Sequence, residues 1–207
     1  MHLYLRPMAC SLAAHIAVLE ADLPVAMHYV SNSQRTDDGM DYLAIAPSGY
    51  VPALRLDSGA VLNEGASVLQ WLADQKPDAR LAPQWGAFER YQLADALHYM
   101  ATEIHQKVFS HLLSARSSDE AKERAQGLLA PTLDNLTRRL GNREVLVGSS
   151  FTVADAYLVV LLNWFQHVGS DLSRWPALAA YHARHLQRPS VAHAIADEMA
   201  EYKRQVA

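Results

Sequence analysis

The single cysteine of the chain, Cys10, is the side chain best suited to nucleophilic chemistry. It lies between a predicted strand, His2 to Leu5, and a predicted helix, Ser11 to Ala21. Unpaired amides and the positive dipole at the start of a helix stabilise an anion, so this place favours a thiolate. With one cysteine, Cys-x-x-Cys redox and zinc patterns are excluded, and any chemistry here involves a single thiol. The alternative is that Cys10 is a small buried apolar residue, which is common for a free cysteine.

Two further motifs have the chemistry to bind parts of a peptide. Val51-Pro52 precedes a predicted strand, and a cis bond at Pro52 would leave the Val51 amide and carbonyl free to pair with a ligand backbone. A trans proline at a strand start is the alternative. Glu64 and Gly65 stand at a predicted helix start, where amides bind a carboxylate and Glu64 can accept an ammonium group. The alternative is a simple helix cap with a glutamate favoured by the dipole.

The elements around these motifs predict an α/β thioredoxin-like domain over residues 1–75. The pattern over residues 2–30 is strand, helix and strand, followed by short strands at Ala53 to Leu56 and Val61-Leu62 and by a helix from Glu64 to Asp74. A βαβ unit followed by a hairpin and a helix packs as a small mixed sheet flanked by helices.

Residues 76–86 are predicted to be a linker because Pro77 and Pro83 cannot continue the preceding helix. Residues 87–207 are predicted to form an all-α domain, with helices over 87–114, 119–140, 153–168, 176–186 and from 190 to about 202. Thr152 is expected to cap one helix, with Asp155 reaching back to the cap amide. The apolar run after Asp155 predicts that this helix is the core of the second domain.

Composition excludes several classes of protein. The net charge is −4 and no basic run stands out, which argues against nucleic-acid binding. No apolar run is long enough for a membrane helix, and no signal-peptide pattern is present, so we expect a cytoplasmic protein that binds no membrane. No metal site is predicted.

Jointly, the motifs resemble those of the glutathione transferase superfamily, most closely its bacterial beta class. The resemblance covers essentially the whole chain. Its motifs are Cys10-Ser11-Leu12 with His15, Asn63-Glu64-Gly65, Glu89-Arg90-Tyr91, Glu103 with His105, Phe151 to Tyr157, and Gln187-Arg188-Pro189.

The resemblance implies that glutathione, as co-substrate, lies along the first domain. Its cysteinyl backbone would pair with Val51 beside a cis Pro52, and its γ-glutamyl end would bind Glu64 and Gly65. For its glycyl carboxylate, Arg35 and Gln34 are equally possible partners. Further glutathione-binding candidates on the helix from Ala87 are His98, Thr102, Glu103 and His105. An α-helical spacing of i, i+4 and i+7 predicts that His98, Thr102 and His105 share one face, although a solvated face is the alternative.

The implied activity is transfer of an alkyl or aryl group to the glutathione sulfur, typical of detoxification. Cys10, Ser11 and His105 are the candidates for acting on the thiol, and Cys10 could instead support thiol-disulfide exchange. The electrophile would bind between the domains in a pocket lined by Met8, Phe109, Leu112, Leu113, Trp164 and His167, although core packing is the alternative for most of these.

The chain also departs from the family pattern. Gly65 stands where many relatives have serine, and Gln106 stands where the family often has lysine, with Lys107 one residue later. These departures motivate an alternative in which the chain is a non-enzymatic ligand-binding or partner-binding member of the fold. A homodimer is expected from the family, through the helices 63–74 and 87–114.

Overall fold

The computed structural model describes residues 1–206, which group into two compact units. The N-terminal unit consists of Met1–Ala82 together with the C-terminal segment that begins at Arg188. The helical unit consists of Pro83–Gln187.

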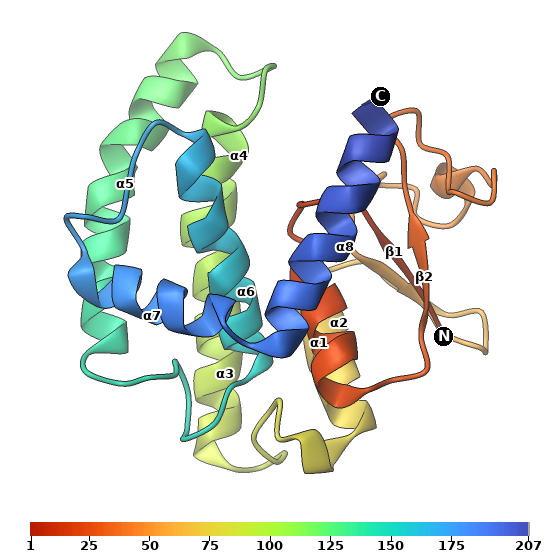
Figure 1. Cartoon of the computed structure of the whole chain (residues 1–207), viewed down its shortest axis with the longest axis horizontal. Helices are drawn as coiled ribbons and strands as arrows, with labels where there is room; N and C mark the ends of the chain where they lie inside the picture. The colour runs from red at the N-terminus through yellow and green to blue at the C-terminus, as the bar shows by residue number, and fades with distance from the viewer. Residues whose placement is uncertain (207) are drawn as a thin grey trace. The chain divides into compact units, whose positions relative to one another are not determined.

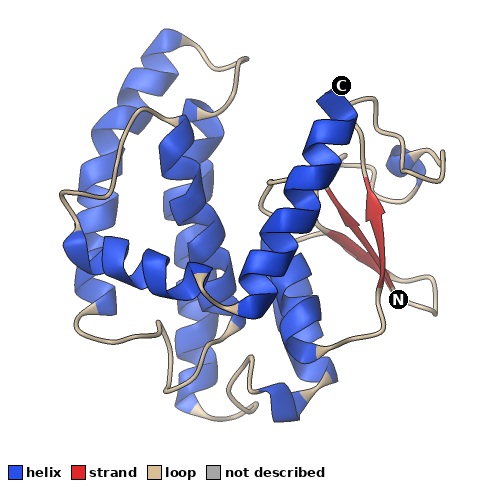
Figure 2. Ribbon diagram, in the orientation of Figure 1, coloured by secondary structure: helices blue, strands red, loops and turns tan. Residues whose placement is uncertain are grey.

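The N-terminal unit contains a four-stranded sheet with the order β2-β1-β3-β4. The strands are drawn in red in Figure 2. β1 (His2–Leu5) pairs in parallel with β2 (Ala26–Tyr29), while β3 (Ala53–Arg55) is antiparallel to both β1 and β4 (Val61–Leu62). The parallel pair needs a crossover, and α1 (Leu12–Ala21) supplies it. The predicted thioredoxin-like plan is therefore confirmed.

Helices α2 (Gly65–Gln75) and α8 (Pro189–Val206) complete this unit, with short 3₁₀ helices at Tyr42–Ala44 and Pro77–Ala79. α8 packs beside α1, as Figure 1 shows. The Arg188 guanidinium donates to both carboxylate oxygens of Glu20 at 2.8 Å, and α8 buries Val191 and Ala194. The last helix therefore belongs to the unit that carries the sheet, whereas its helical pattern alone placed it with residues 87–207.

The helical unit contains α3 (Phe88–Tyr99), α4 (Ser110–Leu112), α5 (Asp119–Leu140), α6 (Val153–Asn163) and α7 (Pro176–Leu186). A π-helix, Met100–Phe109, joins α3 to α4, and a 3₁₀ turn, Trp164–His167, follows α6. Every residue of α6 is buried, which confirms it as a core helix. Within residues 1–206, none of the helices combines the length and the apolar character that crossing a membrane requires.

The start of α6 is fixed by the buried Asp155 carboxylate. Its Oδ2 accepts hydrogen bonds from the Thr152 amide at 2.8 Å and from the Thr152 hydroxyl at 2.9 Å. Its Oδ1 accepts hydrogen bonds from the Leu146 amide and the Tyr181 hydroxyl, both at 2.7 Å. The predicted contact between Asp155 and the cap amide is thus present, and the same carboxylate also joins α7 and the preceding loop to α6.

Candidate functional site

Cys10 lies half-buried in the loop between β1 and α1, just before α1 begins at Leu12. Its Sγ donates a hydrogen bond to the Val51 carbonyl at 3.2 Å. Burial raises the pKa of the Cys10 thiol from 9.0 to about 12, although hydrogen bonds from the amides of Cys10 and Ser11 act in the opposite direction. The thiolate that the sequence suggested is therefore not the resting state, because desolvation outweighs the helix start.

Val51 and Pro52 form the second part of this site, and the bond between them is cis, as predicted. Pro52 is buried, and Val51 is half-buried beside it. The Val51 carbonyl accepts the thiol hydrogen bond, while its amide has no hydrogen-bond partner among residues 1–206. Since a carbonyl oxygen has two lone pairs, Val51 still offers a donor and an acceptor to a ligand backbone.

The start of α2 forms the third part and abuts the cis proline. Glu64 is the N-cap in an extended conformation, with an exposed side chain that makes no capping bond. A Cβ added at Gly65 would lie 3.7 Å from Pro52 Cδ. The fold therefore brings together the three motifs of the sequence. Cys10 is hydrogen-bonded to the Val51 carbonyl, and Gly65 lies against the Pro52 ring.

Ser11 takes a different role from the one expected. Its hydroxyl is fully buried, donates to the Arg6 carbonyl at 3.2 Å and accepts from the Arg6 amide at 3.1 Å. Both of its hydrogen-bonding functions are thus used inside the loop. Ser11 holds the loop before α1 in shape, and the structure does not present its hydroxyl to a ligand thiol.

The two candidates for the glycyl carboxylate point to different places. The Gln34 amide nitrogen would lie 3.1 Å from a Cβ at Gly49, so this side chain packs on the loop that leads to Val51. Arg35 is exposed, and its Nη1 donates to the Gly39 carbonyl at 3.3 Å. Of the two, Gln34 is the one that the structure places beside the Val51-Pro52 loop.

A buried pair that the sequence analysis missed anchors the cysteine loop to the last helix. Glu198 on α8 accepts a hydrogen bond from the Met8 amide at 2.6 Å, and its other oxygen lies 3.1 Å from His15 Nδ1 on α1. The side chains of Glu198 and His15 are both fully buried. Burial raises the pKa of the Glu198 carboxyl, and its hydrogen bonds to His15 and Met8 oppose the shift. Nothing in an amphipathic helix pattern marks one glutamate as buried, so only the tertiary structure identifies it.

In the helical unit, His105 turns inward. Its Nδ1 lies 2.8 Å from the Tyr157 hydroxyl, and its ring packs edge-on against Trp164 at a centroid distance of 4.9 Å. His98 and Thr102 are exposed instead. The prediction of one shared face is wrong, because these residues enter a π-helix whose i→i+5 turn is wider than that of an α-helix.

Glu103 is engaged by its own helix. Its carboxylate pairs with Lys107 at 2.6 Å, and this hydrogen bond is the main cause of its lowered pKa. The Thr102 hydroxyl donates to the His98 carbonyl at 3.0 Å and to Glu103 at 3.3 Å. Lys107, the cation that follows Gln106, is therefore already paired.

The residues expected in the electrophile pocket separate by burial. Phe109 and Trp164 are buried and pack edge-on against each other at 5.5 Å, so they belong to the core of the helical unit. Leu112 is half-buried, whereas Leu113 and His167 are exposed. Core packing thus accounts for the two large aromatic residues, and the pocket itself stays a prediction.

The pKa of His105 predicts a pH dependence of stability. Burial lowers this pKa from 6.5 to about 4. Between these two pH values the unfolded chain binds a proton that the folded chain does not, so stability rises with pH across this window. His105→Gln should flatten that rise in urea unfolding, whereas the exposed His98→Gln should not. Parallel curves for wild type and His105→Gln would contradict the burial of a neutral imidazole.

Comparison with known proteins agrees with this geometry. The glutathione S-transferase N-terminal domain model matches residues 7–75, and the C-terminal domain model matches residues 99–189. Glutathione S-transferase GstA of Escherichia coli O157:H7 is 36% identical, with 96% of this chain and 98% of that protein covered. The beta class glutathione S-transferase of Sphingomonas chungbukensis is 45% identical, with a TM-score of 0.91 over 96% of this chain and 98% of its own.

A sphingomonad glutathione S-transferase solved in complex with glutathione is also similar, at 41% identity and a TM-score of 0.91, with 96% of this chain and 98% of that chain covered. The matched models cover both units, and the relatives are matched along nearly their whole length. The sequence and the fold are similar to those of a bacterial beta class enzyme. The chain is therefore an enzyme of the glutathione S-transferase family.

Proposed function

We propose that this enzyme conjugates reduced glutathione to hydrophobic electrophiles in a detoxification role. The observation that carries the proposal is the meeting of three motifs in the N-terminal unit, where Cys10 bonds to the Val51 carbonyl and Gly65 abuts Pro52. A thiol, a backbone donor and acceptor, and a helix start with an exposed glutamate match the parts of a γ-glutamyl tripeptide.

In the proposed complex, the cysteinyl backbone of glutathione pairs with the amide and carbonyl of Val51. The γ-glutamyl ammonium group binds Glu64, and its carboxylate binds the Gly65 amide at the start of α2. Gln34, on the loop beside Gly49, is favoured over Arg35 for the glycyl carboxylate. The glutathione complex of the sphingomonad relative supports this class of ligand.

The high pKa of Cys10 suggests its role in conjugation. A thiol with a pKa of about 12 stays protonated at neutral pH, so it donates a hydrogen bond rather than attacking. Donation to the glutathione sulfur stabilises that sulfur as the thiolate and lowers its pKa. The thiolate then attacks the electrophilic carbon; with an aryl chloride, the C–S bond forms, chloride leaves with the bonding pair, and the thiol proton passes to water.

Thiol-disulfide exchange is the second candidate, because the same thiol lies where the cysteinyl part of glutathione would bind. A Cys10 thiolate would attack a glutathione disulfide, form a mixed disulfide and release one glutathione thiolate. The raised pKa leaves little thiolate for this step. We therefore rank exchange below conjugation.

Replacing Cys10 with alanine separates the two activities. Exchange should be lost, while conjugation to chlorodinitrobenzene should keep kcat/KM within about tenfold of wild type, because removing one weak sulfur donor removes only part of the thiolate stabilisation. Calorimetry should still detect glutathione binding. A folded wild-type protein that binds no glutathione, or that binds it and conjugates no electrophile on a broad panel, would refute the proposal.

The glycine at position 65 predicts a gain in affinity. Gly65→Ser adds a hydroxyl donor at the γ-glutamyl end, and its Cβ would meet Pro52 at ordinary contact distances of 3.7 and 3.8 Å. One added hydrogen bond of about 1 kcal/mol should tighten glutathione binding about fivefold. Gly65→Ala is the matched control, since it adds the Cβ without the hydroxyl. Equal affinities of the two variants would show that the hydroxyl finds no ligand.

We also propose a cytoplasmic homodimer. Trp85, Phe88 and Tyr91 near the start of α3 are 69%, 73% and 63% exposed, which is unusual for large aromatic side chains and typical of interface anchors. The family expectation of a dimer through the helices 63–74 and 87–114 includes Phe88 and Tyr91, and Trp85 lies just before the second of these helices. Light scattering at micromolar concentration should give twice the mass of the chain, and a monomer would contradict the proposal.

A further inference from the structure

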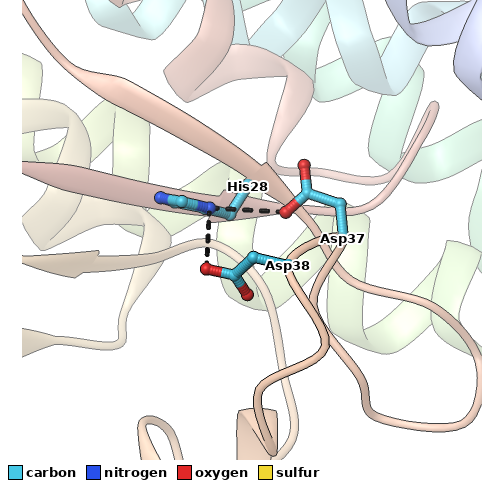
Figure 3. A group of neighbouring side chains, drawn as sticks. All are labelled: His28, Asp37 and Asp38. Carbon is cyan, nitrogen blue, oxygen red and sulfur yellow. Dashed lines mark hydrogen bonds and ion pairs between the residues drawn. The ribbon is translucent and has the colours of Figure 1, made fainter.

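Two carboxylates converge on one imidazole nitrogen at the edge strand of the sheet (Figure 3). Asp37 Oδ1 lies 3.3 Å and Asp38 Oδ2 lies 3.8 Å from Nδ1 of His28 on β2. The three potential ligand atoms all lie within 4.8 Å of one another. His28 is 18% exposed and each aspartate is 44% exposed, so an ion can enter from solvent.

Hydrogen bonds fix the backbone at Asp37 and the carboxylate of Asp38. The Asp37 amide donates to the Tyr29 carbonyl at 2.9 Å, and Val30 forms an antiparallel bridge with Thr36. The Thr36 hydroxyl and the Met40 amide both donate to Asp38 Oδ1. These bonds leave Asp38 Oδ2 free to face His28 Nδ1 at 3.8 Å, so the Asp38 side chain is held in place before any ion binds.

The imidazole ring of His28 is equally constrained. The His28 ring stacks against the rings of both His2 and Tyr4, and in each pair the ring centroids are 5.2 Å apart. His2 Nδ1 lies 3.0 Å from His28 Nε2. When Nδ1 of a histidine binds a metal, its other nitrogen normally donates a hydrogen bond to a fixed acceptor. His2 is in place to be that acceptor.

The two carboxylates at this cluster outnumber the donors that His28 Nδ1 offers them. One N–H at His28 Nδ1 can satisfy one of the two carboxylates, and neither aspartate forms an ion pair with lysine or arginine within residues 1–206. The Tyr4 hydroxyl is a second, independent sign. It is buried and has no hydrogen-bond partner in the same part of the chain. The Arg55 guanidinium, 5.8 Å from the centre of the Tyr4 ring, acts on it first among the charges, and Asp38 and Asp37 act in the opposite direction. A water bound to an ion at this cluster would be a suitable partner for it.

We propose that His28, Asp37 and Asp38 bind a divalent transition-metal ion, with His2 orienting the imidazole. One imidazole nitrogen and two carboxylate oxygens suit Zn²⁺ better than Mg²⁺ or Ca²⁺, which prefer oxygen ligands alone. Ligand atoms about 2.1 Å from Zn²⁺ in a tetrahedral site are about 3.4 Å apart. The separation of His28 Nδ1 from Asp37 Oδ1 is already 3.3 Å, and its separation from Asp38 Oδ2 is 3.8 Å, so the Asp38 carboxylate moves closer when an ion binds. The site shares no residue with the proposed glutathione site.

Zinc calorimetry on the full chain tests the proposal, in a Cys10→Ser background that removes the thiol as a competing ligand. We expect one saturable site per chain in the micromolar range. His28→Gln and Asp38→Asn should each weaken it by at least about tenfold, the lower bound typical even of outer residues. His193→Gln is the matched control, because His193 lies 3.2 Å from Asp197 in an exposed pair elsewhere and should leave the affinity unchanged.

A paramagnetic measurement on the wild-type chain tests the same site without depending on the folding of any variant. Added Mn²⁺ or Co²⁺ should broaden or shift the ring signals of His28 and His2 before those of His193. Absence of saturable zinc binding, equal affinity in the His28→Gln variant, or first broadening at His193 would each overturn the proposal.

Discussion

Asp155→Ala is expected to lower the free energy of unfolding by about 4 kcal/mol, because several buried donors lose one shared acceptor. The buried carboxylate accepts four hydrogen bonds, from the amides of Leu146 and Thr152 and from the hydroxyls of Thr152 and Tyr181. Its removal leaves buried donors without a partner, and each such group costs about 1–3 kcal/mol. Urea unfolding of the variant and the wild type measures the difference.

Partial substitutions at the same cluster provide a graded control for Asp155→Ala. Tyr181→Phe removes one of the four donors together with its need for a partner, and Thr152→Ala removes another, so each should cost about 1 kcal/mol. Asp134→Ala is a matched control on α5, where the carboxylate accepts one hydrogen bond, from the Trp175 indole at 2.7 Å, lies 3.7 Å from the Arg174 guanidinium and is more exposed. A loss at Asp155 no larger than that at Asp134 would contradict the central role of this carboxylate.

Glu198→Ala is expected to destabilise the N-terminal unit by about 3 kcal/mol and to release the loop that carries Cys10. The substitution removes the carboxylate that accepts the hydrogen bond of the Met8 amide and pairs with His15 Nδ1. Glu198→Gln keeps the shape and should cost much less. The neighbouring Asp197→Asn is the control, since that side chain is half exposed and lies 4.0 Å from His15. Similar losses for Glu198→Ala and Asp197→Asn would refute the anchoring role.

The charge of Glu198 can be tested separately from its shape. Burial raises the pKa of this carboxyl above 4.5, so the folded state keeps a proton that the unfolded state has released. Stability is therefore highest at low pH with respect to this group, and it falls as pH rises from 4.5 through the folded pKa. Glu198→Gln should remove that fall from the stability profile.

Glu198→Gln should also lower the pKa of the Cys10 thiol. The negative charge of Glu198 contributes to the raised pKa of Cys10, so Glu198→Gln should shift the pH dependence of thiol alkylation to lower pH. A purely structural role for Glu198 would leave the alkylation profile unchanged. This readout distinguishes an electrostatic effect on the thiol from general loosening of the loop.

Local sequence signals predicted most of the fold because each depends on neighbours along the chain. Alternation and short apolar runs gave the strands of the sheet, and β4 begins and ends where predicted. The helix Asp119–Leu140 was also predicted with its observed bounds, and the Thr152 and Asp155 pattern marked the start of α6. The cis bond at Pro52 was implied by the resemblance to the family, while the local pattern left a trans bond open.

The predictions that the structure corrects concern burial and packing, which a local sequence pattern does not specify. Ser11 and Cys10 are neighbours at a helix start. The Ser11 hydroxyl is hydrogen-bonded inside the loop, and burial raises the pKa of Cys10 so that it stays a thiol. An α-helical spacing placed His105 beside His98, but the π-helix turns it toward Tyr157. α8 looks like any amphipathic helix in sequence, and only its packing on α1 shows that it completes the N-terminal unit.

The sequence by itself determined the order of the elements, because capping, periodicity and turn chemistry act over a few residues. The resemblance of its motifs indicated the family and the three motifs of the proposed glutathione site. The tertiary structure alone decided which ionisable groups are buried and what they touch. Glu198 meets the Met8 amide from 190 positions away, and Asp37 and Asp38 meet His28 across the edge of the sheet. Desolvation and through-space charge depend on three-dimensional distance, so they can be known only once the chain is folded.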